Sequence, residues 1–294
     1  MTSGAPRTRR GFDLRFPKTV LVAVVVILCI PAAIAVNVLA FDGRAYYVTA
    51  LAIITLSMLP FAVAFEGRKP QARELVVIAV LVAITVAGRA AFFMVPQFKP
   101  VVALVIISGA ALGPMSGFVV GSLSGFVSNF IFGQGPWTPW QMFAFGMIGF
   151  IAGLVFSRMA AAIGSGDAPV HARGGNASEK ADTDSVFAQP DGTAVWGWDV
   201  KGRLRTERIR IALLCVFGFV ITFVLYGILL DTAAATIFSS SISFDTLLLM
   251  YISGAPFNLV HAISTVVFLL LLARTMIEKL ERVKKKYGFM QGVS

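Results

Sequence analysis

The chain has 294 residues, of which 57% are apolar and only 14% charged, and its mean hydropathy is +0.82. This composition excludes an ordinary soluble domain and predicts an all-α polytopic membrane protein. The formal charge of +10 does not indicate a nucleic-acid partner, because the basic residues cluster in short polar segments between apolar runs.

Eight apolar runs predict transmembrane helices. In chain order they are residues 20–40, 46–65, 74–93, 101–112, 115–132, 140–156, 209–230 and 247–272. The first is too long for the core of a signal peptide, so it is expected to be retained. The fourth would rise only about 18 Å, against a hydrocarbon core of roughly 30 Å, and could be re-entrant. We expect it to be a short span lodged among its neighbours.

The distribution of basic residues supports eight spans with both termini in the cytoplasm. In that topology 22 of the 25 Lys and Arg residues lie inside, Arg44 and Lys99 lie outside, and Arg89 lies in the membrane. The predicted divisions are a basic N-terminus (1–19), two extra transmembrane helices (20–66), four core helices (74–158), a flexible cytoplasmic linker (159–208), two further core helices (209–273) and a basic tail (274–294).

The helix predicted at 74–93 has two unlike faces. Ala79, Ala83, Ala87 and Ala91 recur every fourth residue and form one smooth stripe, whereas Arg89 projects roughly 200° away from Ala87 and Ala91. The stripe is suited to close approach of another helix, either of this chain or of a partner. Arg89 either snorkels to the outer interface or meets a partner or ligand within the membrane.

Glycines spaced by four predict a tightly packed part of the bundle. They are Gly109, Gly113, Gly117, Gly121 and Gly125, with Gly149 and Gly153 repeating the interval in the following helix.

The outward connection FGQGPWTPWQ, residues 132–141, is the most informative loop. Trp137 and Trp140 could anchor the chain at the membrane interface. Their combination with Asn129, Gln134 and Gln141 also suits a flat or ring-bearing ligand, which would stack on the indoles and accept hydrogen bonds from the amides.

The last predicted helix carries Asn258, His261 and Thr265 on one face, where they either join helices by hydrogen bonds or line a cavity. No acidic residue is expected within the spans beyond Glu74, so a carboxylate proton relay is not predicted. The sequence also lacks a phosphate-binding GxxxxGK[ST] loop and an HExxH metal motif, and no enzyme activity is expected.

The alanine stripe, the glycine-rich helix, the GQGPWTPWQ loop and the Asn258 to His261 face together resemble the substrate-binding S components of energy-coupling factor (ECF) vitamin transporters. The resemblance covers a six-helix core, residues 74–272, preceded here by two extra helices. It implies that the alanine stripe docks a transmembrane T component, which is driven by two cytoplasmic ATPases. The loop looks like that of the branch to which cobalamin uptake has been attributed.

The resemblance therefore implies a vitamin-capturing subunit in the cytoplasmic membrane of a prokaryote, with cobalamin or a related corrinoid as the first expected substrate. Riboflavin, thiamine or pyridoxine are alternatives, and a self-sufficient secondary carrier or a structural scaffold are other classes. No covalently bound cofactor and no metal site are expected, and ATP would be used by the partners. The expected substrate-binding residues are Arg89, Lys99, Asn129, Gln134, Trp137, Trp140, Gln141, Asn258 and His261.

Overall fold

The computed structural model of the chain describes residues 46–67, 70–164, 197–239 and 243–287. The chain divides into two compact units, Met1–Ala64 and Phe65–Ser294. Most of α3 (Tyr46–Gly67) belongs to the first unit. It begins where the second apolar run was predicted to begin and ends just beyond the predicted end at residue 65. The predicted helix at 20–40 and the basic segment 1–19 lie outside the described residues.

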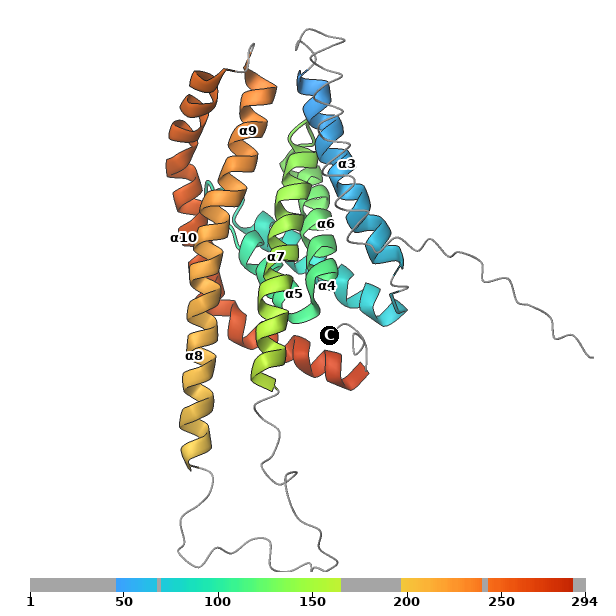
Figure 1. Cartoon of the computed structure of the whole chain (residues 1–294), viewed down its shortest axis with the longest axis vertical. Coiled ribbons are helices and arrows are strands. Elements are labelled where there is room, and N and C mark those ends of the chain that lie inside the picture. The colour runs from blue at the N-terminus through green and yellow to red at the C-terminus, as the bar shows by residue number, and fades with distance from the viewer. Residues whose placement is uncertain (1–45, 68–69, 165–196, 240–242, 288–294) are drawn as a thin grey trace, which may run out of the picture. The chain divides into compact units, whose positions relative to one another are not determined.

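The second unit is a helical bundle (Figure 1). The described residues form helices and no strands, which confirms the all-α fold. Five stretches of these residues are long and apolar enough to cross a membrane. The elements are α4 (Ala72–Ala91), α5 (Val101–Leu112), α6 (Pro114–Phe132), α7 (Thr138–Gly164), α8 (Gly197–Val220), the π-helix η3 (Ile221–Tyr226), α9 (Gly227–Phe238) and α10 (Phe244–Tyr287).

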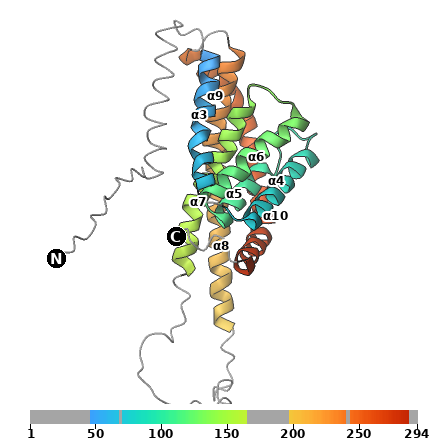
Figure 2. The same ribbon diagram turned by 90° about the vertical axis from the view of Figure 1, so that its right-hand side faces the viewer.

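Three consecutive elements, α8, η3 and α9, form one long rod beside α10 (Figures 1 and 2). The rod continues to Phe238, so the helix end predicted at residue 230 is wrong. This extension brings Asp231 inside a membrane-length segment that runs from Arg208 to Phe238.

The last helix, α10, is longer than predicted and reaches Tyr287. Its final part lies across the lower end of the bundle in Figure 1. Ala273, Ile277 and Leu280 are buried there, and their spacing of three and four residues keeps one apolar face of the helix on the core. Helical structure therefore extends well into the segment predicted as a basic tail.

The short helix α5 is lodged among its neighbours, as predicted. All 12 of its residues are buried, and it packs against α4, α6, α7, α8 and α10. Gly113 ends the helix with a φ of 91°, a backbone conformation that favours glycine, and Pro114 follows at the start of α6. This sharp connection lets α5 and α6 pack beside each other.

The glycine interval produces close backbone contacts between α5, α6 and α7. A Cβ atom added to Gly109 would lie 2.1 Å from the Gly149 carbonyl oxygen, and one added to Gly117 would lie 2.4 Å from the same oxygen. At Gly121 the corresponding distance to the Phe145 oxygen is 2.2 Å. The predicted tight packing is confirmed at these positions, because no larger residue fits without moving the helices apart.

The linker predicted at 159–208 is shorter at both ends, because α7 continues to Gly164 and α8 already begins at Gly197. Residues 165–196 lie outside the described residues.

Candidate functional site

Helix α4 buries one face and exposes the other, with Arg89 on the buried side. Only 7% of Arg89 is exposed, and it shares its face with Ile78, Leu81, Val82 and Thr85. This face packs mainly on α6 and α5. Arg89 is thus turned into the bundle rather than out toward the membrane interface.

The Arg89 guanidinium is held by neutral groups of α6. Its Nη1 donates hydrogen bonds to the hydroxyl of Ser128 and, at 3.0 Å, to Oδ1 of Asn129. The guanidinium carbon also lies 4.4 Å from the ring centre of Phe132 and 6.0 Å from that of Phe145. Hydrogen bonds and the negative faces of aromatic rings both favour a cation in a region of low dielectric constant.

A network at the start of α7 fixes the amide of Asn129. Its Nδ2 donates to the Thr138 hydroxyl at 3.0 Å, and that hydroxyl donates to Oε1 of Gln134 at 3.0 Å. Gln134 is exposed and donates through Nε2 to the carbonyl of Phe126. The 132–141 loop is therefore connected to Arg89 through two side chains, and Asn129 is oriented with its oxygen toward the guanidinium.

Lys99, in the connection between α4 and α5, is a second cation at this place. Its Nζ lies 4.7 Å from the ring centre of the same Phe132 that Arg89 approaches. Its backbone carbonyl accepts a hydrogen bond from Ser264 of α10 at 3.1 Å, which ties the connection to the last helix. Burial, and secondarily the Arg89 charge, lower the pKa of Lys99.

A row of aromatic rings runs from Arg89 to His261. Phe145 of α7 stacks on Tyr226 of η3 with ring centres 5.2 Å apart, and Tyr226 meets the edge of His261 at 4.7 Å. Only 3% of His261 is exposed, yet neither ring nitrogen has a hydrogen-bond partner among the described residues.

We call this group of residues the cationic cluster. It comprises Arg89, Lys99, Ser128, Asn129, Phe132, Thr138, Phe145, Tyr226 and His261.

The two tryptophans and Gln141 flank this cluster at the start of α7. Trp137 and Trp140 are half-buried, and the Trp137 ring packs so closely on Gly135 that a Cβ there would lie 2.5 Å from it. Oε1 of Gln141 is buried without a hydrogen-bond partner in the described part of the chain. Gln141 thus offers an unused acceptor, whereas Trp137 is held against its own loop.

Asn258 has a partner that sequence reasoning overlooked. Its Nδ2 donates to Asp231 of α9 at 2.8 Å, and a Cβ on Gly254 would lie 2.3 Å from the same carboxylate. Thr232 and Tyr251 form a further hydrogen bond between α9 and α10 at 2.8 Å. The Asn258 amide therefore joins two helices in this structure, one turn before the buried His261.

The alanine stripe lies on the exposed side of α4. Ala79, Ala83, Ala87 and Ala91 are all exposed, on the side opposite to Arg89. The stripe therefore does not pack inside the described bundle, and it leaves a smooth helix surface open to another molecule.

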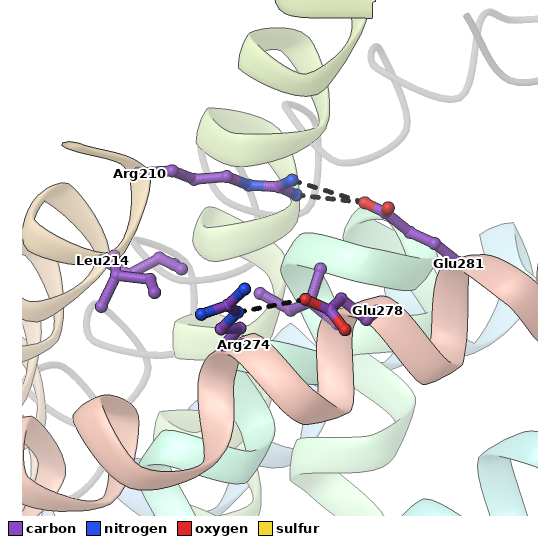
Figure 3. Close-up of a pocket in the computed structure, with 7 residues that line it drawn as sticks. Arg210, Leu214, Arg274, Glu278 and Glu281 are labelled. Atoms are coloured by element: carbon purple, nitrogen blue, oxygen red, sulfur yellow. Dashed lines mark hydrogen bonds and ion pairs between the residues drawn. The ribbon is translucent and has the colours of Figure 1, made fainter. Parts of the chain in front are cut away.

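Away from the cluster, a pocket lies between α8 and the last part of α10 (Figure 3). Arg210 pairs with Glu281 at 3.4 Å, and Arg274 pairs with Glu278 at 3.2 Å. The pocket has a volume of about 80 Å³, far below the roughly 300 to 1,000 Å³ of typical small-molecule sites. We therefore place the candidate binding site at the cationic cluster.

Several residues of the cluster were missed from the sequence. Ser128, Phe132 and Tyr226 lie in apolar runs, where a single hydroxyl or ring gives no periodic signal. Tyr226 belongs to a π-helix, a local widening often found at functional sites. Asp231 could have been found from the sequence. It directly follows the predicted run 209–230, and the next residues are again mostly apolar, so the helix could have been extended past it.

Membrane-length helices around a buried cationic cluster define an integral membrane protein with a polar centre. Residues 69–168 match the family described as "ECF-type riboflavin transporter, S component". The match agrees with the predicted resemblance to ECF S components over this segment, which is about a third of the chain. The segment holds α4 to α7 and therefore Arg89, Asn129 and the alanine stripe.

No curated protein and no solved structure matches the chain significantly.

Proposed function

We propose that this chain is the substrate-capturing membrane subunit of an ATP-driven ECF vitamin importer. The observation that carries the proposal is that α4 has two different faces. One face places Arg89 in a buried polar cluster, and the opposite face exposes the alanine stripe. One face serves a ligand and the other serves a partner. The family match includes the same helix.

Riboflavin is the first candidate substrate, because the matching family is described as a riboflavin S component. Cobalamin or a related corrinoid is the second, since the loop GQGPWTPWQ resembles the cobalamin-type branch. Both have extended ring systems with many hydrogen-bonding groups, which suits the half-buried Trp137 and Trp140 and the unused acceptor of Gln141.

The proposed function is binding and release without covalent chemistry. Arg89 and Lys99 supply charge, Asn129 and Gln141 supply directional hydrogen bonds, and His261 supplies a nitrogen that lacks a described protein partner. A ligand that gives His261 a hydrogen bond also relieves the cost of a buried unpaired polar group. Inward release then follows when a partner favours a conformation with lower substrate affinity.

The proposed partners are a transmembrane T component and two cytoplasmic ATPases. Ala83 and Ala87, near the middle of α4, would contact a helix of the T component at short distance. The proposed topology has both termini in the cytoplasm and the 132–141 loop outside, on the basis of the charge distribution.

The first test is purification of the chain in a mild detergent and identification of any retained small molecule by mass spectrometry. Titration of that molecule into the Arg89→Ala, Trp137→Ala and Gln141→Ala variants follows. Loss of a well-placed anchor is expected to cost about 2 kcal/mol or more, roughly a thirtyfold weaker Kd. If all three variants bind like the parent, the proposed site is wrong.

Reconstitution separates this function from a self-sufficient carrier. Liposomes with the chain alone are expected to bind the vitamin without accumulating it, and addition of the T component, the ATPases and ATP should start uptake. Accumulation by the chain alone would instead establish a secondary carrier. A failure to bind any vitamin under either condition would overturn the proposal.

A further inference from the structure

The cationic cluster holds two positive charges for which the described residues offer no ion-pair partner. Arg89 bonds to the neutral side chains of Ser128 and Asn129, and Lys99 lies over the ring of Phe132. Asp231, an acidic residue of the neighbouring helix α9, is bonded to Asn258 instead. Two cations thus share one aromatic ring within the described part of the chain, with no carboxylate at ion-pair distance.

This arrangement has a cost that a ligand can offset. Buried cations in proteins are normally paired, because their removal from water is not repaid by neutral dipoles alone. Only Nη1 of Arg89 donates hydrogen bonds within the described residues, although a guanidinium has five N–H donors. The remaining donors of Arg89 and the ammonium of Lys99 are therefore available to an anion.

His261 is a second indication of a ligand, on the helix whose Ser264 hydroxyl is bonded to the Lys99 backbone. It is 97% buried, and both of its ring nitrogens lack a partner among the described residues. The row Phe145, Tyr226, His261 connects it to Arg89, and the Lys99 backbone is bonded to Ser264 on the same helix. A neutral imidazole offers one N–H, which can donate to an anionic oxygen.

We infer that the substrate carries an anionic group, a carboxylate or a phosphate, which binds to Arg89 and Lys99 and accepts a hydrogen bond from His261. The inference rests on the proposed function and narrows it to vitamins or vitamin derivatives that carry such a group, so that among flavins it favours riboflavin 5′-phosphate over neutral riboflavin. The anionic group supplies the counter-charge that the described residues do not. Both cations lie near one ring, with Arg89 Cζ 4.4 Å and Lys99 Nζ 4.7 Å from the ring centre of Phe132.

The test uses pairs of probes that share a scaffold and differ in charge. The pairs are riboflavin with riboflavin 5′-phosphate, pyridoxal with pyridoxal 5′-phosphate, and pantothenol with pantothenate, and cyanocobalamin is added as a single probe. Binding to the purified full chain is measured by calorimetry in a maltoside detergent and a phosphate-free buffer, so that neither detergent nor buffer competes for an anion site. The tightest probe is expected to be anionic, and its neutral counterpart is expected to bind at least about tenfold more weakly.

Variants of Lys99 make the test specific, because Lys99 lies in a half-buried connection and outside the packed helices. Lys99→Gln should weaken the anionic probe about tenfold and change its neutral counterpart less than twofold, whereas Lys99→Arg should restore the preference. Arg89→Gln should act in the same direction and more strongly. Lys279→Gln, which removes an exposed cation near the end of α10, is the matched control and should have no effect.

The outcomes separate this inference from the proposed function. If a neutral probe binds tightest, or if Lys99→Gln weakens both members of a pair equally, the chain still captures a vitamin but the anionic class is wrong. If none of the probes binds, both proposals fail. If the variants change only the amount of anionic phospholipid that co-purifies and leave probe binding untouched, the counter-charge comes from lipid and the inference is overturned.

Discussion

Replacement of Ala83 by Trp should separate partner docking from folding and ligand binding. Ala83 is exposed on the face of α4 opposite to Arg89, so the larger side chain meets no described neighbour in the isolated subunit. Exposed substitutions of this kind usually change the free energy of unfolding by less than about 0.5 kcal/mol. An effect of that size on binding would alter the ligand Kd by less than about 2.5-fold.

The same substitution should abolish close contact with a partner helix. Small residues at intervals of four allow two helix backbones to approach closely, and an indole in the middle of the stripe prevents this. We therefore expect loss of co-purification with the T component and loss of ATP-dependent uptake, with ligand binding by the isolated chain retained.

Two variants on the same helix serve as controls. Ile84→Trp places the same indole on exposed surface about 100° further round the helix and should preserve uptake. Leu81→Ala creates a cavity on the buried face and should destabilise the subunit by roughly 2 to 5 kcal/mol. The docking interpretation is refuted if Ala83→Trp resembles Leu81→Ala, with lost stability and lost binding, or if it resembles Ile84→Trp.

Three further predictions concern packing, the α9 and α10 contact, and topology. Gly149→Ala should destabilise the bundle by about 1 to 3 kcal/mol in a detergent unfolding assay, because its Cβ would lie 2.2 Å from a backbone oxygen. Gly125→Ala, whose Cβ would lie 3.3 Å from its nearest atoms, should destabilise it less. Asn258→Ala should lower the free energy of unfolding by about 1 to 3 kcal/mol, because it leaves the Asp231 carboxylate without its amide donor. Asp231→Asn should lower it less, because the new amide oxygen still accepts the hydrogen bond. Equal losses in the two variants would contradict this account. A cysteine at Gln134 should react with an impermeant maleimide in intact cells, and a C-terminal epitope should be detected only after permeabilisation; the reverse pattern would exclude the proposed topology.

The two faces of α4 could be derived from the sequence because helix geometry alone determines them. A spacing of four residues places Ala79 and Ala83 on nearly the same line, and the same rotation turns Arg89 away from them. The glycine interval was informative for a similar reason, since a missing side chain implies a close neighbour. The lodging of α5 followed from its length, because 12 residues cannot cross the hydrocarbon core alone.

The partners of these residues were decided only by the tertiary structure. Arg89 meets Ser128 and Asn129, which are 39 and 40 positions further along the chain, and no local pattern connects residues so far apart. The pairing of Asn258 with Asp231 likewise depends on how α9 continues past the apolar run and packs on α10. The sequence by itself identified Arg89 and His261 as polar side chains within apolar runs. Only the packing of the helices decided which of these side chains have a hydrogen-bond partner among the described residues and which, like His261, have none. Hydrogen bonds require specific distances, and the periodicity of a sequence does not encode them.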